Sequence, residues 1–220
     1  HLDTALTVNK GTSAQATFIR QASLIVKART LVDQGKFAEA AALVPTSAIP
    51  STYQYLFATS SSKGESLGLW SIVNSTARLS VSDSSEIING VPTTTKNALP
   101  FASANDPRVA VKPGAAVTPP VVSEDGSTPQ FVQLIWGRFD PIPMVSGIDA
   151  RLIEAEAKLN ANDLAGMRSI LNTLRATPPK ISIYQPAAMA PLPTPASQDA
   201  ATTLFFREKA FWTFGRGQRL

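Results

Sequence analysis

Apolar and polar positions follow helical spacing over residues 147–176, and this stretch is the strongest structural signal in the chain. Ser146 and Asp149 form a capping box, the pattern that satisfies free amides at a helix start. A polar break at residues 160–163 precedes a second helix with the same pattern. The first helix has Ile148, Leu152, Ala155 and Leu159 on one face and Arg151, Glu154 and Lys158 on the other, and the second has Leu164, Met167, Leu171 and Leu174. The pattern predicts a helical hairpin.

A second hairpin is predicted near the start of the chain. Residues 13–34 have a helical apolar face, and Gly35 is the residue type that commonly ends a helix. Residues 37–44 form a short alanine-rich helix that stops before Pro45. The turns at Gly35 and Asn162 are similar to the inter-helix turn of tetratricopeptide repeats. Because the two turns lie so far apart in the sequence, we do not expect a regular repeat array.

The insert between the hairpins, residues 49–142, has weak periodicity and many turn-forming residues, and predicts a loop-rich region with short strands. Prolines concentrate at 112–130 and at 177–196, and both stretches are predicted to be exposed loops. The other expected elements are a helix at 66–75, strands at 76–81 and 131–136, and a last helix at 197–214. We therefore predict a mainly α fold, a single domain over residues 1–220 that is incomplete at both ends, built from helical hairpins resembling tetratricopeptide repeats.

Composition and charge narrow the possible functions. Hydrophobic residues make up 44% and charged residues 16% of the chain, as in folded proteins. The net charge of +4 is modest and the basic residues are scattered, so no nucleic-acid surface is expected. Cysteine is absent, which excludes disulfides and thiolate metal sites. No apolar run approaches the ~20 residues that a membrane-spanning helix needs.

Catalytic chemistry has little support in these residues. His1 is the only histidine and lies at a terminus, which argues against a Ser-His-Asp triad and against a histidine metal site. Glu154 and Glu156 face different directions on a helix, and Asp149 is assigned to a cap, so no carboxylate pair resembles that of a glycosidase. No phosphate-binding glycine loop or calcium loop is present. We therefore predict a protein that is not an enzyme and uses no cofactor or metal.

Aromatic residues are the candidate ligand contacts. Tyr53, Tyr55, Trp70 and Trp136 lie on the irregular insert, and Tyr184 lies on the second proline-rich loop. An exposed aromatic ring stacks on the apolar face of a sugar while its polar edge stays hydrated. The alternative is that these rings pack the insert onto the helices, because most aromatic residues are buried. The tyrosines are expected to be more exposed than the tryptophans.

Four segments carry a resemblance to a known family. Residues 140–157 lead from a proline-rich entry into a helix with an R-x-x-E-A core, and Asp106-Pro107-Arg108 forms a DPR turn. Residues 171–176 resemble an INxxRA helix end, and residues 206–219 resemble an ERxxELxxEGxR helix. In this order they resemble the SusD/RagB-like outer-membrane nutrient-binding proteins. One departure is Phe214, which stands where that family usually has an acidic residue before glycine.

The resemblance implies a non-catalytic α-helical scaffold that binds an oligosaccharide or peptide. It also implies a location on the cell surface, a TonB-dependent SusC-like outer-membrane transporter as partner, and attachment to the outer membrane through a lipid anchor outside this chain. The family fixes no ligand residues by motif, so the five aromatic residues remain physical candidates only. Because family members are longer, we expect this chain to be part of a larger protein.

A different class of function remains open. The chain is alternatively a helical scaffold, an interaction subunit of a larger membrane-associated assembly with no small-molecule ligand. Its apolar faces and proline-rich loops would then bury against other chains. Arg207, Glu208, Arg216 and Arg219 are candidates for a partner surface, although such residues more often cap helices or form solvated ion pairs.

Overall fold

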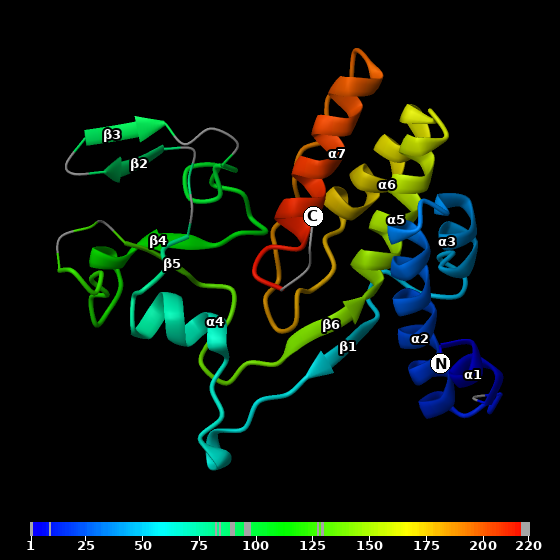
Figure 1. Cartoon of the computed structure of the whole chain (residues 1–220), viewed down its shortest axis with the longest axis horizontal. Helices are drawn as coiled ribbons and strands as arrows, with labels where there is room; N and C mark the ends of the chain where they lie inside the picture. Colours follow the sequence, from blue (N-terminus) through cyan, green and yellow to red (C-terminus); the bar gives the residue numbers. More distant parts are fainter. Residues whose placement is uncertain are drawn as a thin grey trace.

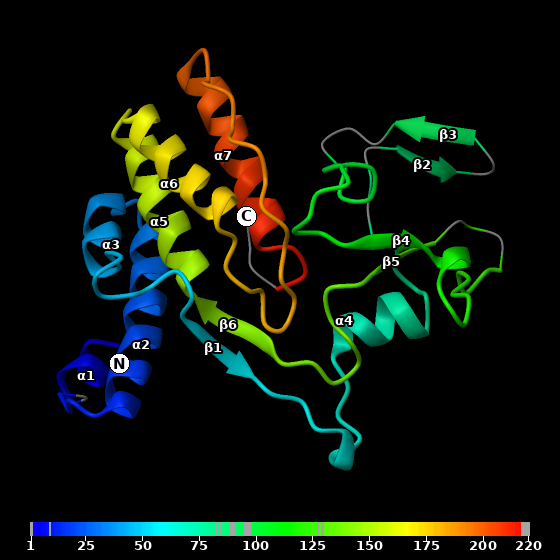
Figure 2. The same cartoon turned by 180° about the vertical axis from the view of Figure 1, so that it is seen from behind.

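A computed structural model describes residues 2–216 apart from 9, 82, 84, 89–90, 95–97, 127 and 129. The long helices gather in one half of the molecule and the insert occupies the other, with a two-stranded ribbon between them (Figures 1 and 2). The coarse fold prediction, a helix-rich chain with short strands, is confirmed. The helices are α1 (Leu2–Val8), α2 (Ala14–Asp33), α3 (Phe37–Leu43), α4 (Gly68–Trp70), α5 (Gly147–Asn160), α6 (Leu164–Ala176) and α7 (Gln198–Trp212). The strands are β1 (Gln54–Phe57), β2 (Ser85–Ile88), β3 (Val91–Thr94), β4 (Val111–Pro113), β5 (Phe131–Gln133) and β6 (Ile142–Ser146).

Helix α5 begins at the expected cap and runs through the centre of the helical half (Figure 1). The Asp149 carboxylate accepts hydrogen bonds from the backbone nitrogen of Ser146 at 2.6 Å and from its hydroxyl at 3.0 Å. The predicted apolar face is also confirmed, because its four residues are buried against α6 and α7. The local sequence pattern was sufficient to predict the start and the apolar face of α5, because both involve residues within one or two turns of each other.

The predicted charged face of α5 is wrong for Arg151, which is buried. Helix α3 and the segment after it cover this side of α5, so Arg151 donates hydrogen bonds to the carbonyl of Val44 and the hydroxyl of Thr46. It also pairs with Glu154 at 2.7 Å. Burial lowers the pKa of Arg151 and raises the pKa of Glu154. Of the three residues on the predicted charged face, only Lys158 is exposed. Helix α5 is therefore covered both on this face and on its apolar face.

The α2–α3 hairpin forms as predicted. Ser13 caps α2 by accepting a hydrogen bond from the backbone nitrogen of Ala16 at 3.1 Å. Gly35 ends the helix with φ of +75°, a conformation that glycine adopts without strain. A core distinct from that between α5, α6 and α7 forms where this hairpin packs against α5, and it includes Ile25, Ala40 and Ile153.

Three antiparallel ribbons organise the insert: β1 with β6, β2 with β3, and β4 with β5. The predicted strand at 76–81 is wrong, because a π-helical turn at Ser71–Ser75 is followed by Ala77 with φ of +52°, which breaks extended backbone. The strand predicted at 131–136 ends at Gln133. The side-chain oxygen of Gln133 accepts hydrogen bonds from the amides of Ile135 and Trp136, both at 2.9 Å, in place of a continuing ladder.

The proline-rich segment 177–196 is irregular as predicted, but it is not simply exposed. Ile181 and Leu192 are buried against the helices. Polar side chains of α6 hold the segment: Arg168 donates to the carbonyl of Leu192 at 2.8 Å, and Arg175 donates to the carbonyl of Ala190 at 2.7 Å. The segment therefore closes one side of the core. The first proline-rich stretch, 112–130, also departs from the prediction, since it contains the end of β4 and a buried Gly114.

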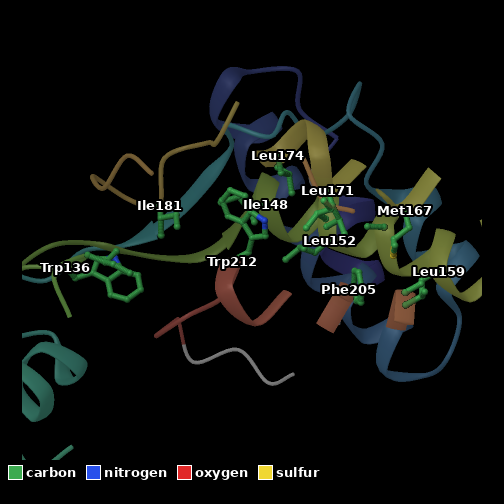
Figure 3. Close-up of a cluster of buried hydrophobic side chains, with 14 of the residues drawn as sticks. Trp136, Ile148, Leu152, Leu159, Met167, Leu171, Leu174, Ile181, Phe205 and Trp212 are labelled. Carbon is green, nitrogen blue, oxygen red and sulfur yellow. The ribbon is translucent and has the colours of Figure 1, made fainter. Parts of the chain in front are cut away.

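The larger core lies between α5, α6 and α7 (Figure 3). Its labelled side chains extend from Leu159 and Met167 at one end to Trp136 beside the β1–β6 ribbon at the other. Trp212 and Phe205 of α7 are fully buried within it. Each aromatic ring of this size removes more apolar area from water than any single aliphatic side chain of the core. The core fixes α7 beside α5 and thereby creates the polar surfaces described next.

Candidate functional site

The aromatic candidates Tyr53 and Tyr55 lie beside Phe18 but differ in exposure. The expectation that tyrosines are more exposed than the tryptophans is wrong for Tyr53, which is buried at 6% exposure with its hydroxyl donating to the carbonyl of Phe18 at 2.8 Å. Burial raises the pKa of Tyr53 to about 12. Tyr55 is 40% exposed and stacks on the Phe18 ring with centroids 5.7 Å apart. Of these two, only Tyr55 has an exposed ring.

The other three aromatic candidates belong to the larger core. Trp136 is 2% exposed, so packing is its role. Trp70 is partly buried beneath the Arg138 guanidinium, which lies 5.6 Å from its ring centroid. Tyr184 is also partly buried, and its hydroxyl donates to the carbonyl of Pro107 at 2.7 Å. The structure therefore packs four of the five candidate rings into or against the two cores, leaves Tyr55 exposed, and does not assemble the five into one stacking platform.

A charged cleft lies over α5, with α2 on one side and α7 on the other. Its volume is about 350 Å³, within the range of small-molecule sites. The floor is one stripe of α5, because residues at i, i+3, i+4 and i+7 lie on the same helix face. From one end to the other, the floor residues are Asp149, Leu152, Ile153 and Glu156. The cleft therefore has an aliphatic middle between two carboxylates.

Two arginines share the carboxylate at the first end of the cleft. Arg29 of α2 lies 2.9 Å from one oxygen of Asp149, and Arg216, beyond α7, lies 2.5 Å from the other. Arg216 also donates to the hydroxyl of Ser146 at 3.0 Å. Asp149 thus caps its own helix and links α2, α5 and the segment after α7. Asp33 of α2 also lines the cleft, so its cations and carboxylates are equal in number.

A one-to-one ion pair closes the other end of the cleft. Lys209 of α7 lies 3.0 Å from the carboxylate of Glu156, and both side chains are largely buried. The sequence prediction missed Arg29 and Lys209 and dismissed Glu156. It named Arg216 and Glu208 only as candidates for a partner surface, which is wrong for both because they are buried in ion pairs. The available signal was the seven-residue spacing of Asp149 and Glu156, which places two carboxylates on one helix face. Their cationic partners come from distant segments and have no local signature.

A second charged cluster lies beside the larger core. Arg108 is fully buried, pairs with Asp106 at 2.7 Å and Glu208 at 2.6 Å, and lies against the rings of Phe211 and Trp212. Arg175 of α6 joins it, 2.9 Å from Glu208.

The electrostatics of this cluster favour its ionised state. Burial alone would lower the pKa of Arg108, but Asp106 and Glu208 outweigh that effect and raise it. Burial likewise would raise the pKa of Asp106, but hydrogen bonds and charge from Arg108 hold that pKa below its ordinary value. The cluster links the insert, α6 and α7 through ion pairs, and its role is structural.

The cleft presents paired charges at its two ends and an aliphatic middle. Among residues 2–216 as described, no three acidic or histidine side chains lie close enough together to hold a metal ion. None of the described helices is both long and apolar enough to span a bilayer. Comparison of the chain with protein-family models, curated proteins and solved structures gave no match.

Proposed function

We propose that this chain is a non-catalytic, cell-surface nutrient-binding protein of the SusD/RagB-like type. In this role it binds an oligosaccharide or peptide and acts with a TonB-dependent SusC-like transporter of the outer membrane. A lipid anchor outside residues 1–220 attaches it to the membrane. The two helical hairpins, α2–α3 and α5–α6, then correspond to the tetratricopeptide-like scaffold of that family.

One observation carries the proposal: the four segments that resemble the family meet one another through buried charges. Arg108 of the DPR turn pairs with Glu208 of the last helix, and Arg175 of the INxxRA-like helix end reaches the same carboxylate. Asp149, on the helix with the R-x-x-E-A core, pairs with Arg216. These pairs hold the four segments against one another in the fold. The contacts support reading the ordered segments as one framework.

The absence of a catalytic arrangement at the cleft is consistent with a binding role. Asp149 and Glu156 are seven residues apart on one helix, about 10 Å along its axis. Each is already paired with a cation, and aliphatic side chains separate them. Catalytic carboxylates need a reacting bond between them and matched proton affinities. This arrangement favours holding a ligand over transferring a proton.

Purification of the native protein from its own membranes, with identification of the chains that accompany it, tests the proposal. A stoichiometric TonB-dependent β-barrel transporter is the expected partner. Recovery of the protein without any transporter, in repeated mild extractions, would overturn the nutrient-uptake role.

A second candidate is a scaffold subunit that binds other proteins and no small ligand. The observation that favours it is a set of exposed apolar side chains on the two faces of the β1–β6 ribbon. Its members are Tyr55, Leu56, Phe57 and Met144, each at least 40% exposed. Exposed apolar groups close together in a structure are typical of protein contacts. Recovery within a different stoichiometric assembly in the same membrane experiment would favour this role.

A further inference from the structure

Arg138, in the turn after β5, is an exposed arginine whose hydrogen-bond donors are unused. Every other arginine in the described part of the chain has a hydrogen bond or an ion pair. The guanidinium of Arg138 has neither, and among the described residues no carboxylate oxygen lies within 4.0 Å of its nitrogen atoms. A guanidinium carries five N–H donors in a fixed fork. Those of Arg138 are therefore free to meet a ligand.

Two aromatic rings orient this guanidinium. Its central carbon lies over Trp70 of α4, 5.6 Å from the ring centroid, and over Phe139, 5.1 Å from the ring centroid. Both rings are half-buried, so part of each is open to solvent beside the exposed arginine. The negative face of an aromatic ring attracts a guanidinium and leaves the N–H groups at its edge available. Arg138 is therefore held in place without loss of its donors.

The larger core fixes the backbone on which these groups stand. The carbonyl of Arg138 accepts a hydrogen bond from the backbone nitrogen of Leu67 at 2.8 Å. Leu67 and Trp136 are both buried members of that core. Trp70 follows Leu67 by three residues and packs against the same core. The ring and the guanidinium are therefore positioned by one rigid part of the fold before any ligand arrives.

Formal charge around this position is balanced. Lys63 and Glu65 precede α4, and Asp140 follows Arg138 by two residues. The carboxylate of Asp140 is engaged, since it accepts a hydrogen bond from the backbone nitrogen of Gly137 at 2.6 Å. Long-range attraction of an anion is therefore not what this position provides. Recognition depends on hydrogen bonds from the free guanidinium and on contact with the two rings.

We propose that Arg138, Trp70 and Phe139 form a site for an acidic sugar. The guanidinium donates two hydrogen bonds to the carboxylate of a uronic acid, because paired oxygens match its fork. The two rings contact the apolar face of the sugar. A sulfate ester offers similar paired oxygens, so the group recognised is an oxyanion on a sugar. The inference rests on the proposed nutrient-binding function and deepens it by naming the class of ligand.

Isothermal titration calorimetry on the full chain tests the acidic group. The probes are trigalacturonate and its methyl ester, and a sulfated galactose trisaccharide and its unsulfated form. At least one acidic probe is expected to bind, about tenfold more tightly than its neutral counterpart, since charge-assisted hydrogen bonds are lost in the latter. Which acidic probe binds identifies the source of the oxyanion. Failure of both acidic probes, or equal affinity for the neutral forms, would overturn the proposal.

Tryptophan fluorescence locates the contact. Trp136 is 2% exposed and Trp212 is fully buried, so Trp70 is the tryptophan that a ligand can reach. An acidic probe should change the emission of the wild type. In Trp70→Phe, which keeps a ring beside Arg138, calorimetry should still detect binding while the change in emission disappears. Binding to the wild type without any change in emission would place the ligand elsewhere.

Variants of the arginine test its role. Arg138→Gln is expected to weaken binding of the acidic probe about tenfold and to leave that of the neutral form almost unchanged. Arg138→Lys keeps the charge but loses the fork, and should also weaken binding. Arg207→Gln is the matched control, because Arg207 is also exposed over a ring, that of Phe211, but this ring is fully buried. The control should bind as wild type does.

Both Arg138 variants are expected to fold, because the guanidinium makes no hydrogen bond within the described residues. Circular dichroism checks this, and Arg138→Lys keeps the test decisive if Arg138→Gln does not fold. Wild-type affinity for the acidic probe in the folded variants would exclude this site.

The outcome is separable from that of the membrane purification. A transporter that accompanies the native protein, together with no binding of an acidic sugar, removes only the site at Arg138. Binding of an acidic sugar that is sensitive to Arg138, without any transporter, keeps the site and removes the nutrient-uptake role.

Discussion

Arg108 and Glu208 lie a hundred residues apart in the chain and form a fully buried pair of hydrogen bonds, at 2.6 and 3.0 Å. The guanidinium is also in contact with the rings of Phe211 and Trp212, one turn further along α7. This pair joins the insert to the helical half of the molecule. Substitutions of these two residues are therefore expected to lower the free energy of unfolding strongly, and their effects are expected to be coupled.

Glu208→Gln is expected to destabilise the protein by about 3–5 kcal/mol, because it removes one of the two carboxylates that pair with the buried charge of Arg108 and takes the same carboxylate from Arg175. Arg108→Met should cost a similar amount for the same reason. The double variant should lose less than the sum of the two single losses, since neither charge is then left alone. Urea unfolding followed by circular dichroism measures all three. Glu124→Gln, in the exposed pair with Arg78, is the matched control and should unfold almost as wild type does. If the double variant lost as much stability as the two single variants together, the proposed coupling between Arg108 and Glu208 would be contradicted.

Asp106 should make stability depend on pH in acid. Its pKa in the folded protein lies below the ordinary value of 3.8, so the unfolded chain takes up the proton first as the pH falls. The resulting stabilisation is fully present above that ordinary value and is lost as the pH falls through the folded pKa. Unfolding midpoints in urea, measured from about pH 5 down to about pH 3, should fall more steeply for wild type than for Asp106→Asn. Equal slopes would show that Asp106 does not carry this dependence.

Gly147 is expected to tolerate no side chain. A Cβ atom at this first residue of α5 would lie 2.1 Å from the carbonyl oxygen of Pro50, which is backbone and cannot rotate away. Gly147→Ala should therefore destabilise the protein by about 1–3 kcal/mol, through displacement of the loop that leads into β1. Gly68→Ala, at the start of α4, is the control, because nothing lies within 4 Å of its Cβ position. Thermal unfolding compares the two, and equal melting temperatures would contradict this packing.

The aromatic candidates should separate into packing and contact residues. Trp136→Ala is expected to cost about 3–5 kcal/mol, because a fully buried ring leaves a cavity. Tyr55→Ala removes a ring that is 40% exposed and should leave the unfolding midpoint close to that of wild type. Under the proposed function, Tyr55→Ala weakens binding of an oligosaccharide or peptide that the wild type holds. Unchanged binding would leave Tyr55 without a ligand role.

The sequence patterns correctly predicted the features that depend on interactions between residues close together in the chain. The cap at Ser146 and Asp149, the end of α2 at Gly35 and the apolar face of α5 all depend on residues within a few positions of each other. The strand predicted at 76–81 failed because the conformation of Ala77 depends on its surroundings and not on its own preference. The pairing of β1 with β6 was missed for a related reason, since most of the insert separates the two strands in the sequence.

By itself, the sequence determined where the long helices begin and end and which face of each is apolar, because helical periodicity is a local property. Only the tertiary structure decided which charges are buried. Arg151 is buried because α3 covers it, and Asp149 pairs with Arg216, which lies 67 residues away in the sequence. Burial and ion pairing depend on which segments fold against each other, and a charged residue has the same local pattern whether it faces water or a partner. The cleft over α5 is a product of that packing.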